Sequence, residues 1–104
     1  EGDFAVAIQL QPKNAYTYYN RGNLFAAEKN YTRAIADYTH AISLDPNMAQ
    51  AYYNRAVAHF YSGDIKSAQS DLSHAGELGL YNAYALSKKM SEAQPKKKQS
   101  QAKK

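Results

Sequence analysis

The strongest constraint on the fold of this chain is an internal repeat with a period of 34 residues. Shifting the sequence by this period superimposes Ala41 on Ala75 and Leu44 on Leu78. Two complete copies, residues 15–48 and 49–82, are identical at ten of their 34 positions. A unit of this length cannot bury its apolar face alone, so successive copies must stack on one another to form a continuous core. The sequence therefore predicts a repeat array.

Each copy carries the hydrophobic pattern of two helices. Apolar residues recur at spacings of three and four, which is typical of helices with one buried stripe. Pro46 should end the second helix, because proline disfavours helical geometry in the residue before it. Gly79 is expected to form a left-handed cap after the fourth helix. The predicted helices span residues 15–28, 32–44, 49–62, 65–78 and 82–94.

The first residues of the chain repeat the pattern of a second helix. Phe4, Ala7 and Leu10 hold the places that apolar residues hold one period later. We therefore expect residues 1–14 to be the second helix of a repeat whose first helix precedes them. Phe4, Ala7 and Ile8 would then present an uncovered apolar face. Upstream repeats or a second copy of the chain, giving a homo-oligomer, would cover this face.

Charge and cysteine content exclude several classes of protein. Cysteine is absent, which excludes disulfide scaffolds, thiolate metal sites and cysteine nucleophiles. The formal charge of +4 comes from five lysines among the last ten residues, and without them eight basic residues face nine acidic ones. Residues 95–104 are too polar to fold and are predicted to be a disordered basic tail. Binding of nucleic acid or of an anionic surface through this tail is one alternative function.

The sequence lacks the constellations that catalysis requires. His40 and His74 lie one period apart, so they should stack along the array rather than converge on a metal. His59 belongs to a different helix and has no paired carboxylate nearby in the sequence. No glycine-rich phosphate loop, GxSxG motif or HExxH motif occurs. We expect a protein that is not an enzyme and that needs no metal or cofactor.

Large and small residues alternate in the same way in both copies. The first copy has Tyr18, Gly22, Ala34, Tyr38, Ala41 and Pro46, and the second has Tyr52, Ala56, Ala68, Leu72 and Ala75. Over residues 1–94 this pattern resembles the tetratricopeptide repeat family, and residues 71–84 resemble the terminal repeat of some bacterial members. The resemblance implies an all-α helix-turn-helix solenoid. Its parts would be a half repeat at 1–14, full repeats at 15–48 and 49–82, and a capping helix at 83–94.

Charged residues recur with the same period. Two arginines occupy a position where the resembled family often has leucine. Acidic and basic residues could pair within a repeat or between neighbouring repeats, and the spacing alone does not choose between these arrangements. We expect these charges to be structural, because they repeat with the architecture. The candidate ion-pair residues are Asp3, Arg21, Asp37, Arg55, Asp71 and Lys89.

The resemblance also implies a function. In the resembled family the first helices line a concave groove that binds extended peptide segments of partner proteins. Tyrosine supplies rigid contact area, and an asparagine amide both donates to and accepts from a peptide unit. A scaffold that packs only within a longer array or a homo-oligomer is the second alternative function. The groove positions are Tyr16, Tyr19, Asn20, Asn23, Gln50, Tyr53, Asn54, Val57, Phe60, Tyr84, Ser87 and Lys88.

One specialised form of this groove is not expected. Some members of the resembled family hold the terminal carboxylate of chaperone tails with two lysines, two asparagines and one arginine. Asn23, Asn54 and Lys88 match three of these places, but Tyr19 and Tyr84 replace the two lysines. Without these cations the attraction for a carboxylate is much weaker.

Overall fold

Residues 14–93 form five helices and no strand in the computed structural model, which describes this part of the chain. The helix bounds lie within two residues of the predicted ones. The helices are α2 (Ala15–Ala27), α3 (Tyr31–Leu44), α4 (Ala49–Tyr61), α5 (Ile65–Glu77) and α6 (Asn82–Glu92). The predicted half repeat with Asp3, Phe4, Ala7 and Ile8, and the predicted basic tail, lie outside the described residues.

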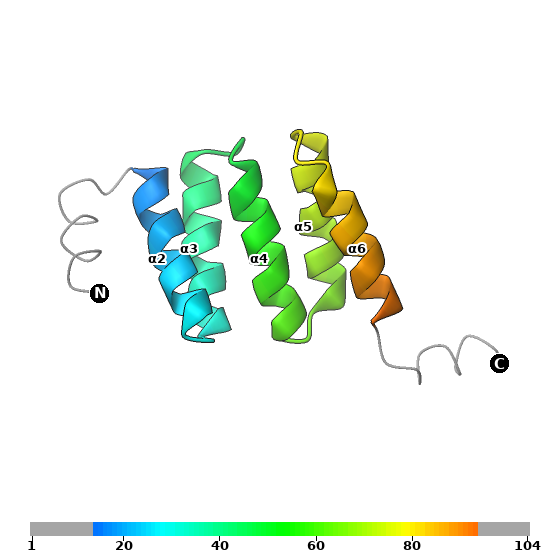
Figure 1. Cartoon of the computed structure of the whole chain (residues 1–104). Helices are drawn as coiled ribbons and strands as arrows, with labels where there is room; N and C mark the ends of the chain where they lie inside the picture. The colour runs from blue at the N-terminus through cyan, green and yellow to red at the C-terminus, as the bar shows by residue number, and fades with distance from the viewer. Residues whose placement is uncertain (1–13, 94–104) are drawn as a thin grey trace.

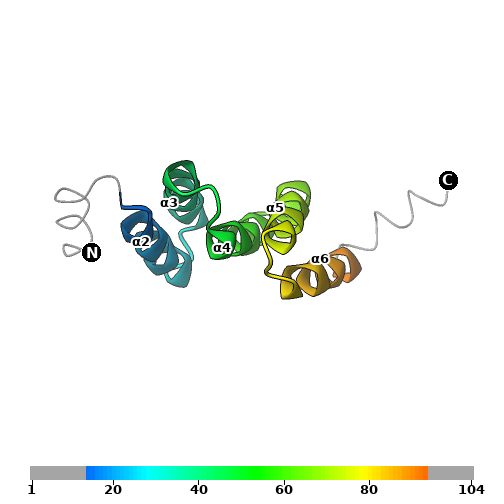
Figure 2. The same ribbon diagram turned by 90° about the horizontal axis from the view of Figure 1, so that it is seen from above.

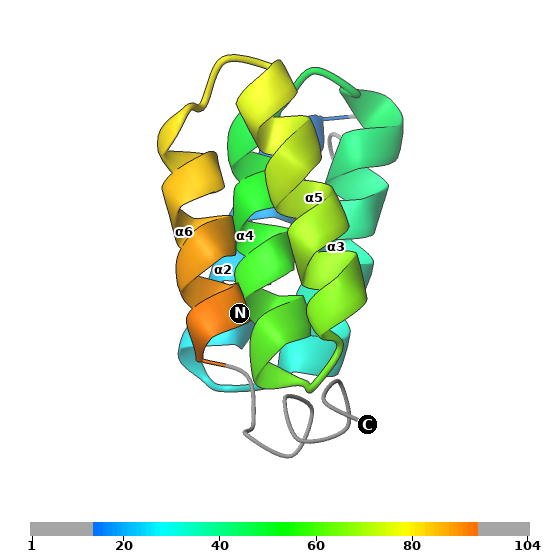
Figure 3. The ribbon, with the colours of Figure 1, turned by 90° about the vertical axis from the view of Figure 1, so that its right-hand side faces the viewer.

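The helices stand side by side in chain order (Figure 1). Seen from above, α2, α4 and α6 form one layer, and α3 and α5 form the other (Figure 2). The same division appears in the end-on view, where α4 and α6 lie to one side of α3 and α5 (Figure 3). Each helix packs mainly against its neighbours in the sequence. The predicted all-α helix-turn-helix solenoid is therefore confirmed.

Local signals explain where the helices begin and end. The side chains of Asn14, Asn30 and Asp64 accept hydrogen bonds from backbone N–H groups in the first turns of α2, α3 and α5, which satisfies donors that a helix leaves unpaired. Gly63 follows α4 with a φ of 96°. Lys29, its equivalent one period earlier, adopts a φ of 64°, a conformation that is costly for a residue with a Cβ atom.

The core is built from matched pairs of large and small residues. Tyr38 and Leu72 occupy equivalent positions in α3 and α5, and both side chains are fully buried. A Cβ atom built on Gly22 would lie 2.7 Å from Cε1 of Tyr38, so the larger ring of the first repeat requires glycine opposite it. The second repeat has the smaller Leu72, and the equivalent of Gly22 is Ala56.

Arginine and aspartate pair within each repeat. Nε and Nη2 of Arg21 donate to the carboxylate of Asp37 at 2.8 and 2.9 Å, and the same atoms of Arg55 donate to Asp71 at 2.7 Å each. The hydrogen bonds to Asp71 raise the pKa of Arg55 above its ordinary value. Of the two arrangements left open by the sequence, the structure has the pairing within a repeat. Lys89 forms no ion pair within residues 14–93.

The three histidines pack against other side chains of the solenoid. His40 stacks on Tyr18 with ring centroids 3.9 Å apart, and His74 stacks on Tyr52 at 4.2 Å. Nε2 of His59 lies 3.8 Å from Oδ2 of Asp71. Residues 14–93 contain no group of three or more side chains placed to hold a metal ion. In the same range, every helix is too short or too polar to cross a membrane.

Candidate functional site

The layer formed by α2, α4 and α6 carries two adjoining hollows. The central hollow, about 250 Å³ in volume, is lined by Asn23, Ala26, Tyr31, Tyr38, Asn54, Val57, Ala58 and Tyr61. The C-terminal hollow, about 370 Å³, is lined by Tyr53, Val57, Phe60, Tyr61, Leu86, Lys89, Met90 and Ala93. Val57 and Tyr61 border both hollows. We call the two together the groove.

A hydrogen-bonded network forms the polar floor of the central hollow. The hydroxyl of Tyr38 donates to Oδ1 of Asn23 at 2.6 Å. Nδ2 of Asn54 donates to the same Oδ1 atom and to the hydroxyl oxygen of Tyr19, both at 3.0 Å. Burial raises the pKa of Tyr38 well above its ordinary value, so its hydroxyl remains a donor. The network joins α2, α3 and α4 at one point.

The same network leaves two polar groups for a ligand. Within residues 14–93, Nδ2 of Asn23 and Oδ1 of Asn54 make no hydrogen bond. Neither atom is sealed from solvent, because no buried side-chain nitrogen or oxygen of the described residues lacks a partner. A donor and an acceptor are therefore available side by side in the central hollow.

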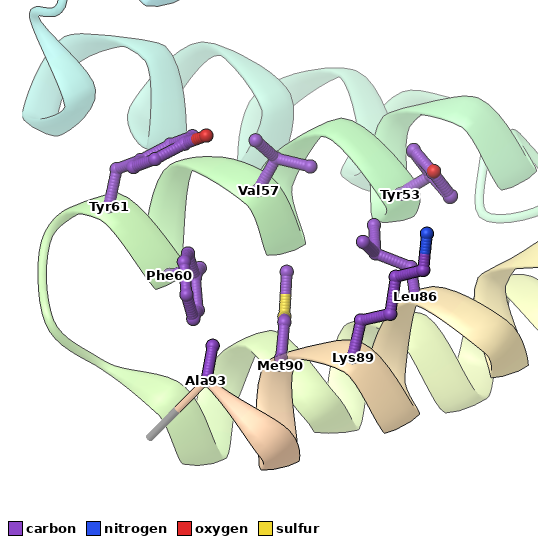
Figure 4. A pocket seen from close by; sticks show the side chains of 8 residues that line it. All are labelled: Tyr53, Val57, Phe60, Tyr61, Leu86, Lys89, Met90 and Ala93. Carbon is purple, nitrogen blue, oxygen red and sulfur yellow. The ribbon is translucent and has the colours of Figure 1, made fainter. Parts of the chain in front are cut away.

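The C-terminal hollow is apolar and lies between two helices (Figure 4). Phe60 of α4 points toward Ala93, which follows α6, and Met90 extends from α6 toward α4 (Figure 4). Tyr61 stacks on Tyr31 with ring centroids 5.5 Å apart, so the rim that both hollows share is aromatic. Such a surface favours the burial of an apolar group.

One positive charge borders this surface. Lys89 is the single charged residue among those that line either hollow. Its stem runs beside Leu86, and its ammonium group lies toward Tyr53 (Figure 4). Lys89 is exposed and has no carboxylate partner in the part of the chain that the structure describes. The groove therefore offers an unpaired cation to a ligand.

The structure places the predicted groove residues in three groups. Asn23, Tyr53, Asn54, Val57 and Phe60 line the hollows. Tyr19 lines neither hollow, but its hydroxyl oxygen accepts a hydrogen bond from Nδ2 of Asn54. The remaining positions do not line either hollow, and these are Tyr16, Asn20, Gln50, Tyr84, Ser87 and Lys88.

The predicted groove residues differ most from the residues that line the hollows on α6. A Cβ atom built on Gly76 would lie 2.4 Å from the ring of Tyr84, so this ring packs directly on the backbone of α5. Because the ring of Tyr84 packs against α5, the residues of α6 that face α4 are Leu86, Lys89 and Met90. Sequence reasoning missed them, although Leu86 and Met90 have the four-residue spacing of an apolar stripe. It also missed the aromatic pair of Tyr31 and Tyr61.

Comparison with known proteins identifies the family. A family model described as a TPR repeat matches residues 22–63, and a second, described as a tetratricopeptide repeat, matches residues 49–78. Together they span more than half of the chain. The chain belongs to the tetratricopeptide repeat (TPR) family. This confirms the resemblance found in the sequence.

Solved structures of other TPR proteins have the same fold. The TPR2B domain of yeast Sti1, in complex with pHsp70, is 28% identical with a TM-score of 0.81 over 88% of this chain and 79% of that one. YrrB, described as a TPR protein with an unusual peptide-binding site, is 30% identical with a TM-score of 0.70, over 74% of this chain and 40% of its own. The first TPR of Spaghetti (RPAP3), bound to an HSP90 peptide, is 24% identical with a TM-score of 0.81 over 86% of this chain and 73% of that one. Among curated proteins, none matches this chain.

Proposed function

We propose that this TPR protein is a non-catalytic protein-interaction module that binds an extended peptide segment of a partner in the groove. The observation that carries this proposal is the junction, at Val57 and Tyr61, of a hollow that contains two asparagine amides and a hollow that is apolar. A peptide lying across this junction would have its backbone over the central hollow and its side chains near the C-terminal hollow.

The polar groups of the central hollow match those of a peptide unit. Each peptide unit has one N–H donor and one C=O acceptor. Nδ2 of Asn23 can donate to the carbonyl, and Oδ1 of Asn54 can accept from the N–H group. The bonds from Tyr38 and Asn54 to Oδ1 of Asn23 fix the orientation of both amides before a ligand arrives. Such preorganisation lowers the entropy lost on binding.

Two similar proteins support the proposal. The Sti1 TPR2B domain, 28% identical to this chain, has been solved in complex with pHsp70. YrrB, 30% identical, is described as having a peptide-binding site. Both use the fold that this chain has.

A substitution at the shared border of the two hollows tests this proposal. We expect Val57→Glu to abolish binding of linear partner peptides, because it places a charge where both hollows meet. Ser73→Glu, on the exposed side of α5, is the matched control and should bind normally. Thermal unfolding of both variants shows whether each remains folded. Binding would be measured by titration of labelled peptides selected on the intact chain.

Each alternative function gives a different result in this experiment. A scaffold within a longer array or a homo-oligomer would bind no linear peptide in any form of the chain. A chain that binds through its basic residues 95–104 would lose its ligand on truncation of this segment, with a steep dependence on salt. If Val57→Glu binds the peptides as the unchanged chain does, the groove is not the binding site.

A further inference from the structure

The two hollows differ in the kind of ligand group that each can hold. The central hollow has two asparagine amides on its floor. Seven of the eight residues that line the C-terminal hollow are aliphatic, aromatic or methionine residues, and the eighth is Lys89. An amide floor can hold backbone of any sequence, but an apolar hollow favours particular side chains. Sequence preference therefore belongs to the C-terminal hollow.

The position of Lys89 adds a second requirement. Its ammonium group lies at the same end of the hollow as Tyr53 (Figure 4). Residues that line the groove include no acid, so no carboxylate of the lining competes with a ligand for this cation. In an extended peptide, residues two positions apart project from the same side. An apolar side chain in the hollow thus places the side chain two positions away near the rim.

We infer that the C-terminal hollow selects partner segments in which a bulky apolar residue lies two positions from an aspartate or glutamate, the apolar side chain entering between α4 and α6 and the acid pairing with Lys89. This inference rests on the proposed function. The selected acid is a side-chain carboxylate within the peptide. A free C terminus is not required, because Lys88, at the place of the terminal-carboxylate clamp, lies outside the lining of both hollows.

The probes that test this inference are N-acetylated, C-amidated peptides of nine residues. The central residue is phenylalanine or alanine, the residue two positions away is aspartate or asparagine, and the other residues are serine and glycine. Binding to the full chain is followed by fluorescence titration and by amide chemical shifts in NMR spectra. Replacing phenylalanine by alanine should weaken binding about tenfold. Replacing aspartate by asparagine should weaken it about two- to fivefold, and less at high salt.

Charge variants of the protein assign the acid to its partner. Lys89→Gln should weaken binding of the aspartate peptide about two- to fivefold and leave the asparagine peptide unaffected. Lys66→Gln removes the same charge from an exposed position of α5 and should change neither. If Lys88→Gln, and not Lys89→Gln, abolishes the preference for aspartate, the assignment of Lys89 is overturned.

A further variant tests the C-terminal hollow itself. Ala93 is exposed, so Ala93→Leu should leave the fold intact while filling the hollow opposite Phe60. It should weaken binding of the phenylalanine peptide to the level of the alanine peptide. Equal binding of all four peptides, with shifts at Asn23 and Asn54, would overturn this inference and leave the proposed function standing. Absence of shifts at both hollows with every peptide would overturn the proposed function as well.

Discussion

A single missing methyl group decides how the first repeat packs. In an open helix, Gly22→Ala would stabilise the protein by about 0.5–1 kcal/mol. Here the new Cβ atom would lie 2.7 Å from a ring that is only 1% exposed and whose hydroxyl is held by Asn23. We therefore expect Gly22→Ala to lower the free energy of unfolding by about 1–3 kcal/mol, measured by urea denaturation.

The second repeat supplies the control for this prediction. It places Ala56 and Leu72 where the first repeat places Gly22 and Tyr38. The double variant Gly22→Ala with Tyr38→Leu should therefore recover part of the lost stability, because the larger helix residue then faces a smaller partner. An increase in stability from Gly22→Ala alone would contradict the packing argument.

Asn54 has a structural role as well as its proposed binding role. The sequence of the chain suggested only a ligand contact for Asn54. In the structure, its Nδ2 atom donates hydrogen bonds to Tyr19 and Asn23 of the preceding repeat. We expect Asn54→Ala to lower the free energy of unfolding by about 1–2 kcal/mol in addition to weakening peptide binding. Asn20, at the equivalent position, is exposed and has no hydrogen bond from its side chain within residues 14–93. Asn20→Ala should leave the urea midpoint unchanged, and an equal loss for both variants would refute this role.

At the scale of helices, the turn between α2 and α3 is less favourable than its counterpart between α4 and α5. Lys29 has a φ of 64°, whereas glycine fills the equivalent position 63. Glycine adopts this left-handed conformation without the steric cost that the Cβ atom of lysine causes. This gain should exceed the cost of the extra freedom of glycine in the unfolded chain, so Lys29→Gly should stabilise the protein by about 0.5–1 kcal/mol. Gly63→Ala should act in the opposite direction. Thermal and urea unfolding would measure both, and a loss from Lys29→Gly would show that its side chain contributes to stability.

The arginine–aspartate pairs hold the two helices of each repeat together. The side chains of Arg55 and Asp71 are 19% and 9% exposed, which places this pair between a surface and a buried salt bridge. Asp71→Ala leaves the arginine without its partner and should lower the free energy of unfolding by about 1–3 kcal/mol. The double variant with Arg55→Met should lose less than the sum of the two single changes. Strictly additive losses would show that the pair does not act as a unit.

For the molecule as a whole, periodicity predicted most of the fold and only part of the groove. Helix bounds followed from the apolar stripe and from turn residues such as Pro46 and Gly79, which act locally. The pairing of Arg21 with Asp37 could not be chosen, because two arrangements satisfied the same spacing. On α6 the hollow is lined by Leu86, Lys89 and Met90, whereas Tyr84, Ser87 and Lys88 were predicted for the groove, because this helix has no second copy in the sequence with which to compare it. Its orientation depends on the contact between Tyr84 and Gly76, which joins two helices and leaves no periodic signal.

Because each helix packs mainly on its sequence neighbours, a change at one end of the array should have local effects. Met90 of α6 is 4% exposed and packs in the cluster that contains Leu72 and Ala83. Met90→Ala should therefore increase amide hydrogen exchange most in α6, less in α5 and least in α2. Ala85→Ser, at an exposed position of the same helix, is the control. An equal loss of protection in α2 and α6 would show that the described helices open as one cooperative unit. In that case α6 could not open at the groove while α2 and α4 stay folded.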